Sequence, residues 1–270
     1  MNDKRYLIPL EIANATVEVG YAKANKSSLS LLLLGILAGA FIAFGAVGAT
    51  TMAALVGDKG LAKLIGAALF PIGLMLVIMA GAELFTGNNL MTLGVMTGRY
   101  SIKDMLRNWI IVYIGNFIGS IAIAILVAKT GLYLGAVGET AIAIATKKVT
   151  IVTNLGLGAI VSRAILCNII VVLAVWLATG AKDITGKIFA CWFPIMLFVL
   201  SGYEHSIANM FYIYVGKYMG AEIIESQIWL NNIIPVTIGN LIGGAVIIPI
   251  SYYLIFFKKK KGKLAIESSK

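Results

Sequence analysis

The sequence predicts an all-α membrane protein, a bundle of six transmembrane helices. The chain is 60% hydrophobic and 13% charged, and its mean hydropathy is +0.93. Soluble domains carry about 25% charged residues, so this composition favours an integral membrane protein. Long charge-free runs supply the spans, and the alternating pattern of a membrane β-barrel is absent.

Six apolar stretches are long enough to cross a bilayer as helices, which takes about 17–25 mostly apolar residues each. The predicted spans are residues 29–53, 62–85, 106–128, 156–179, 188–212 and 231–257. We expect them to form one transmembrane domain within residues 1–270.

Residues 1–28 are predicted to form an amphipathic helix that lies on the membrane surface. The segment is charged throughout and lacks the long apolar core of a signal peptide. Its apolar residues recur at helical spacing. They are Leu7, Leu10, Ala13, Val17 and Tyr21.

The distribution of Lys and Arg predicts that both termini lie in the cytoplasm. Six spans place the termini on one side, and most of the 22 Lys and Arg residues lie on that side. The basic tail, residues 258–270, begins with the run Lys258–Lys261, which we expect to anchor at lipid headgroups. The net charge of +10 therefore requires no nucleic-acid partner.

Two polar stretches interrupt the apolar pattern, and they match each other. Residues 80–88 read A-G-A-E-L-F-T-G-N and residues 201–209 read S-G-Y-E-H-S-I-A-N, so both contain G-x-E-x-x-x-x-N. Further on, V-Y-I-G-N-F-I-G (112–119) matches V-T-I-G-N-L-I-G (236–243). The agreement in order and spacing predicts an internal repeat.

The two repeats are predicted over residues 29–135 and 150–257, with three spans each. Because three is odd, the second repeat crosses the membrane inverted. Inverted repeats with matched interruptions are the sequence pointer to a transport site. The glycines permit the chain to break, and the freed backbone groups are tolerated at depth only where they line a cavity or are buried in protein. Half-helix N-termini at such breaks suit an anion.

The acidic residues of the two stretches are expected to hold the breaks open. A charged residue at the bilayer centre costs at least about 2.5–3.5 kcal/mol, so Glu83 and Glu204 need a purpose. Accepting backbone N–H bonds at the breaks is one, and direct contact with a substrate is the alternative. We expect asparagines to bond across the breaks and between helices. They are Asn88, Asn209, Asn116, Asn168 and Asn240.

Over nearly its whole length the chain resembles the formate/nitrite transporter family. The segments that carry the resemblance are G-Y-E-H-S-I-A-N-M, A-E-L-F-T-G-N and I-P-V-T-I-G-N. The resemblance implies an aquaporin-like six-helix protomer with spans two and five broken, and a homopentamer in which each protomer has its own pore. It also implies transport of small monovalent anions. Formate is the leading substrate, with nitrite and hydrosulfide as alternatives.

The positions at which this sequence matches the motifs of the family imply which residues line the pore. The pore histidine falls on His205, the only histidine in the chain, and the threonine after the first break falls on Thr86. The periplasmic and cytoplasmic constrictions fall on Phe70 with Phe198 and on Leu74 with Leu84, respectively.

The resemblance also implies residues around the pore. Glu204 and Asn209 match the residues that support the histidine loop. The family's vestibule lysine would fall at position 152, which is Val here, so Lys148 is the candidate and Lys147 the alternative.

A histidine between two apolar constrictions suggests how an anion could pass. A bare anion is costly to desolvate, whereas its neutral acid is not. We expect a basic vestibule with Lys148 to concentrate the anion, which gains a proton as its own pKa rises in the low-dielectric zone. The proton comes from water or from His205, or else His205 stays neutral and only donates a hydrogen bond. Titration of His205 would make the pore pH-sensitive.

Two other classes of function compete. An intramembrane enzyme is disfavoured, because one histidine and two separated cysteines supply no usual metal site, and no H-E-x-x-H occurs. We expect no cofactor. A facilitator for water or glycerol is the better rival, but its paired N-P-A breaks read T-G-N and I-A-N here.

Overall fold

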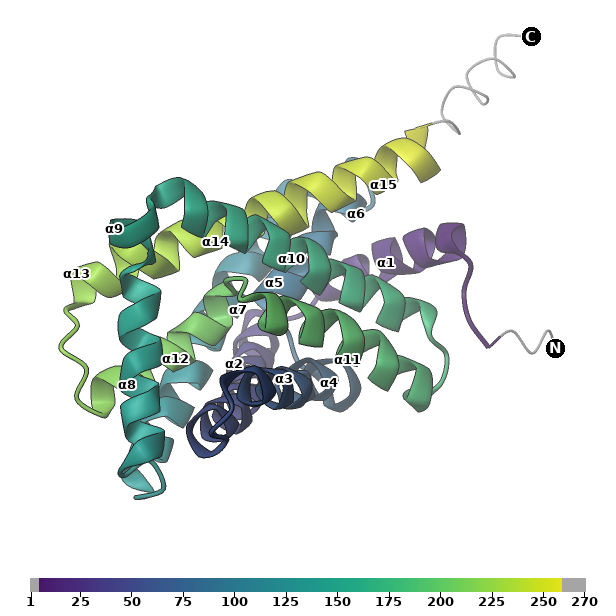
Figure 1. The fold of residues 1–270 in the computed structure, drawn as a ribbon. Coiled ribbons are helices and arrows are strands. Elements are labelled where there is room, and N and C mark those ends of the chain that lie inside the picture. The colour runs from purple at the N-terminus through teal and green to yellow at the C-terminus, as the bar shows by residue number, and fades with distance from the viewer. Residues whose placement is uncertain (1–4, 259–270) are drawn as a thin grey trace, which may run out of the picture.

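The computed structural model describes residues 5–258, which form a bundle of tilted helices (Figure 1). Within that range six helices are long and apolar enough to span a membrane. They are Ser28–Leu55, Lys59–Gly81, Ile102–Lys129, Leu157–Gly180, Ile184–Ser201 and Glu225–Phe256. The six predicted spans are confirmed. The predicted anchor at Lys258–Lys261 lies, beyond Lys258, outside the described residues.

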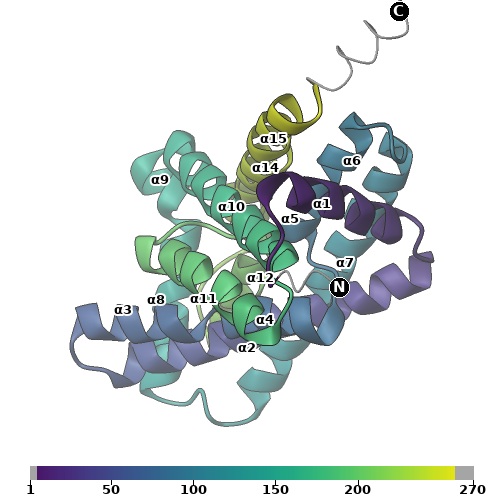
Figure 2. The ribbon, with the colours of Figure 1, turned by 90° about the vertical axis from the view of Figure 1, so that its right-hand side faces the viewer.

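The predicted N-terminal helix is present as α1 (Pro9–Ala24). It lies across one end of the bundle (Figure 2) and packs against α10 (Leu157–Gly180) and α6 (Thr92–Met96). Its buried face is therefore covered by protein. That face is formed by Ile12, Ala13, Thr16, Val17 and Gly20.

An ion pair fastens the outer face of α1. Arg99 donates two hydrogen bonds of 2.9 Å to Glu18, and its guanidinium lies 4.0 Å from the centre of the Tyr21 ring. The Tyr21 ring is thus exposed on one side and covered by the Arg99 guanidinium on the other. The hydrogen bonds from Arg99 hold the pKa of the exposed Glu18 carboxyl below its usual range.

The first half of the bundle is built on close contact between α2 (Ser28–Leu55) and α7 (Ile102–Lys129). A Cβ at Gly39 would collide with the carbonyl of Asn116, and one at Gly119 with that of Ile36. Small residues let the two backbones touch, as is usual between membrane helices. Span two follows α2 in three pieces: α3 (Lys59–Leu69), α4 (Ile72–Leu76) and a π-helical turn (Val77–Gly81).

The second half repeats this arrangement with α10 and the last span. That span consists of α13 (Glu225–Ile228), α14 (Ile234–Leu241) and α15 (Ile248–Phe256), joined by π-helical turns. A Cβ at Gly243 would collide with the carbonyl of Ile165 on α10. The glycines of the repeated I-G-N-x-I-G motif thus bring matching helices together in both halves.

Between the halves lies α8 (Ala136–Val149), followed by the short α9 (Ile151–Leu155). The helix α8 packs on α2 and on α12 (Ser206–Tyr218). It stands at the end of the molecule opposite the two described chain ends (Figure 1). Lys147 and Lys148 therefore lie on a packed helix.

Candidate functional site

Span two breaks at Ala82–Leu84, between the π-helical turn and the short α5 (Phe85–Asn88). Gly81 has φ +87°, a conformation that glycine adopts most readily. Neighbouring spans supply acceptors for the backbone N–H groups at this break. The N–H of Glu83 donates to the carbonyl of Leu34 at 3.2 Å, and the N–H of Phe85 donates to Asn116 Oδ1 at 2.9 Å.

Span five breaks in the same way, between α11 (Ile184–Ser201) and α12. Gly202 is left-handed, with φ 75°. The N–H of Glu204 donates to the carbonyl of Arg163 at 3.4 Å, and the N–H of Ser206 donates to Asn240 Oδ1 at 2.9 Å. The two predicted breaks are thus present, each closed by an asparagine of the I-G-N motif.

Each break also holds a lysine–glutamate–asparagine cluster. In the first, Lys23 Nζ lies 2.7 Å from Glu83 Oε2, and Asn88 Nδ2 donates to the same oxygen at 2.8 Å. In the second, Lys148 Nζ lies 2.9 Å from Glu204 Oε2, and Asn209 Nδ2 donates to that oxygen at 2.7 Å. Asn108 and Asn232 complete the clusters by accepting from Asn88 and Asn209. The glutamates are 3% and 4% exposed, and each has a cation as its partner.

His205 and Thr86 meet where the two breaks approach each other. The Nε2 atom of His205 lies 2.8 Å from Thr86 Oγ1, and both residues are buried. The N–H of Ala208 donates to His205 Nδ1 at 3.1 Å, so Nδ1 is an acceptor. The neutral imidazole therefore carries its proton on Nε2 and donates it to the threonine hydroxyl. Asn168 Nδ2 contacts the Thr86 carbonyl at 3.4 Å.

Apolar side chains surround this polar pair. The rings of Phe70 and Phe198 meet edge to face with centroids 5.7 Å apart, and Phe198 stacks on His205 at 5.9 Å. Leu74 and Leu84 are 2% exposed and belong to the same buried apolar cluster as the two phenylalanines. Leu84 takes the position after Glu83 that His205 takes after Glu204, which is why only one break carries an imidazole.

A cavity of about 470 Å³ leads to the pair from one side. Phe70, Phe198 and His205 line it, whereas Leu74, Leu84 and Thr86 do not. The phenylalanines are therefore part of the cavity wall and the leucines are not, while the two constrictions stay a prediction. The charged residues of its wall are Lys63, Lys147, Lys148, Arg163 and Glu204.

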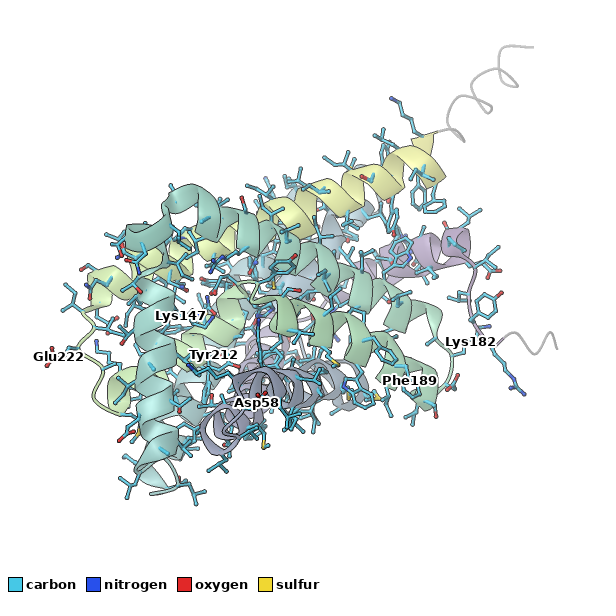
Figure 3. The ribbon with its side chains drawn as sticks, in the orientation of Figure 1. Asp58, Lys147, Lys182, Phe189, Tyr212 and Glu222 are labelled. Carbon is cyan, nitrogen blue, oxygen red and sulfur yellow. The ribbon has the colours of Figure 1, made fainter. Side chains whose placement is uncertain are left out.

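Both candidate vestibule lysines line this cavity, but in different ways. Lys148 is half-buried, pairs with Glu204 and lies 5.3 Å from the centre of the Tyr212 ring. Lys147 is exposed and lies on the same side of the molecule as Tyr212 (Figure 3). Lys148 is thus the lysine that lies beside the histidine loop.

Sequence reasoning missed Lys23, Asn108, Asn232 and Arg163. The repeat contained a signal for the asparagines, because N-x₇-N occurs at 108–116 and again at 232–240. Lys23 and Arg163 come from outside the matched stretches, and only the fold brings them to the breaks.

Residues 10–254 match the family model described as Formate/nitrite transporter. The chain belongs to the formate/nitrite transporter family. It is an integral membrane protein, with six helices in residues 5–258 that are long and apolar enough to span the membrane.

Individual relatives agree along their whole lengths. The chain is 42% identical to "Uncharacterized transporter YrhG" of Bacillus subtilis, covering 94% of this chain and 96% of that protein. It is 40% identical to "Probable formate transporter" of Methanothermobacter thermautotrophicus, covering 93% and 97%. A solved structure described as "Pentameric formate channel with formate bound" is 32% identical, with a TM-score of 0.73, covering 86% of this chain and 98% of that one. These proteins are named as transporters and channels, which agrees with a non-enzymatic function.

Proposed function

We propose that this protein is a membrane channel for small monovalent anions of weak acids, with formate as the leading substrate. One observation carries the proposal. The hydrogen-bonded pair of His205 and Thr86 lies among buried apolar side chains, at the inner end of a cavity with four cationic side chains in its wall. A formate channel among the similar structures and a probable formate transporter among the relatives favour formate over nitrite and hydrosulfide.

Anion entry is favoured by the charges of the cavity. Four cations and one carboxylate line it, which raises the local concentration of anions. Beyond Phe70 and Phe198 the surroundings are apolar, so the ionised form of the substrate is penalised and the pKa of the substrate rises. The anion therefore crosses the two constrictions as its neutral acid.

The arrangement of His205 favours a role as neutral hydrogen-bond donor. Its Nδ1 accepts the Ala208 N–H that begins α12, so protonating Nδ1 would set two donors against each other. The proton that neutralises the anion then comes from water on the cavity side. The Nε2–H and the Thr86 hydroxyl offer the substrate polar contacts halfway along the apolar path.

We further propose a homopentamer, with one pore per protomer, in the cytoplasmic membrane. A pentameric structural relative supports the assembly. The excess of Lys and Arg on the side of the termini supports a cytoplasmic location for both ends.

Uptake by purified protein in liposomes tests the proposal. Formate, nitrite and hydrosulfide are compared with and without an inward proton gradient, and water and glycerol permeation is measured by swelling. We expect formate to enter fastest and the gradient to accelerate it. Anion entry no faster than into protein-free liposomes, together with rapid water or glycerol entry, would replace the anion channel with a neutral-solute facilitator.

A further inference from the structure

Three of the four cations in the cavity wall have side chains without a partner among the described residues 5–258. Lys148 is neutralised by Glu204. The side chains of Lys63, Lys147 and Arg163 make no hydrogen bond or ion pair with any residue between 5 and 258. Their charges are thus available to something that enters the cavity.

Arg163 differs from the two unpaired lysines in its position. Lys63 and Lys147 are exposed, whereas Arg163 is half-buried. Its carbonyl accepts the hydrogen bond from the N–H of Glu204, the residue before His205. Of the three unpaired cations that line the cavity, Arg163 is therefore the one whose backbone is bonded to the second break.

The internal repeat shows that the break does not require this side chain. In the first repeat the carbonyl of Leu34 accepts from the N–H of Glu83, just as the carbonyl of Arg163 accepts from Glu204. The residue that supplies the accepting carbonyl there is a leucine, so this hydrogen bond requires no charged side chain. At the equivalent position in the second repeat, the guanidinium of Arg163 is therefore not needed to form the break.

We propose that Arg163 is the first docking residue for the entering anion and favours anions with two oxygen atoms in one plane. This inference rests on the proposed channel function. A guanidinium presents parallel N–H donors that match both oxygens of a carboxylate or of nitrite, whereas an ammonium acts as a point charge. Hydrosulfide, with a single charged atom, gains only the charge. Arg163 thus holds formate next to Lys148 before the anion meets the phenylalanine constriction.

Arg163→Leu and Arg163→Lys test the inference by formate and hydrosulfide uptake into liposomes, with protein-free leakage subtracted. The salt concentration is about 0.15 M, where charges more than about 8 Å apart are largely screened. We expect Arg163→Leu to raise the half-saturating formate concentration roughly three- to tenfold with an unchanged maximal rate. Arg163→Lys raises that concentration for formate and leaves it unchanged for hydrosulfide.

Lys59→Leu is the matched control, because it removes an exposed cation of α3 that does not line the cavity. It should shift the half-saturating formate concentration less than twofold. A half-saturating formate concentration of Arg163→Lys equal to that of the wild type would overturn the role of the planar guanidinium. Wild-type behaviour of Arg163→Leu, or a lower maximal rate at unchanged half-saturation, would overturn docking altogether. If the wild-type protein transports no formate, the proposed function itself fails, and this inference fails with it.

Discussion

The hydrogen bond between His205 and Thr86 joins the two halves of the chain at one atom pair. Thr86 follows the first break and His205 precedes α12 in the second, so the 2.8 Å contact forms only when both breaks are closed. A buried donor left without its acceptor costs about 1–3 kcal/mol. The threonine hydroxyl therefore fixes the imidazole as well as offering a contact to the substrate.

Thr86→Val replaces the hydroxyl with a methyl group of similar size. We expect formate uptake to fall roughly tenfold, because about 1.4 kcal/mol of lost interaction corresponds to that factor. Thr86→Ser keeps the hydroxyl and should transport within about twofold of the wild-type rate. Initial uptake rates in liposomes measure both. Equal rates for the valine and wild-type proteins would show that the hydroxyl is not needed.

The helix α1 is fixed to the first break by an ion pair at its C-terminal end. Lys23 bonds Glu83 at 2.7 Å and Asn88 Oδ1 at 2.9 Å, and its own carbonyl contacts Asn108 Nδ2 at 3.4 Å. Lys148 plays the matching part at the second break from α8, and its carbonyl accepts from Asn232 at 3.0 Å. The helices α1 and α8, which lie outside the six spans, thus each supply the lysine that pairs with the glutamate at one break.

Lys23→Met should destabilise the protein, because the buried Glu83 carboxylate loses its cation. Removing one partner of a fully buried pair costs about 3–5 kcal/mol, and the partial exposure of Lys23 reduces this. We expect the thermal unfolding midpoint in detergent to fall by several degrees. The double variant Lys23→Met with Glu83→Gln should recover most of the loss, since no uncompensated charge remains. A single variant as stable as the wild type would show that the pair contributes little.

Helices were predictable from the sequence where they are long and apolar, and less so where tertiary contacts decide. The six spans and both breaks followed from hydropathy and from the repeated G-x-E-x-x-x-x-N. The helix α8 is short and carries charges at Glu139, Lys147 and Lys148, so no long apolar run in the sequence predicted it. The partners of the two glutamates were also hidden, because Lys23 and Lys148 lie 60 and 56 residues away along the chain. Hydropathy and repeat patterns do not show which distant residues will form ion pairs.

Charged residues lie at two opposite ends of the molecule as a whole. Lys147, on α8, lies at the left of Figure 3, and Lys182 lies at the right, in the turn between α10 and α11. The described ends of the chain lie on the side of Lys182 (Figure 1). With both termini in the cytoplasm, as we propose from the positive-inside rule, we predict that Lys182 faces the cytoplasm and Lys147 the exterior.

Cysteine labelling in intact cells tests this orientation. A membrane-impermeant maleimide should label Lys147→Cys from outside and label Lys182→Cys only after the membrane is permeabilised. The natural cysteines provide a low background, because Cys167 and Cys191 are both 0% exposed. The reverse pattern would place the termini outside the cell.

The repeat makes the two breaks alike, but the residues whose carbonyls close them differ, being leucine at position 34 and arginine at position 163. If Arg163 docks the anion as we propose, the proposed channel has a cationic docking residue at the second break and none at the matching position of the first. Detailed balance limits what this inequality can do: a site that fills faster from one side also empties faster toward that side. The arginine can make inward and outward flow saturate at different concentrations, but it cannot accumulate anion against a gradient. Any net accumulation must come from protons that cross with the anion.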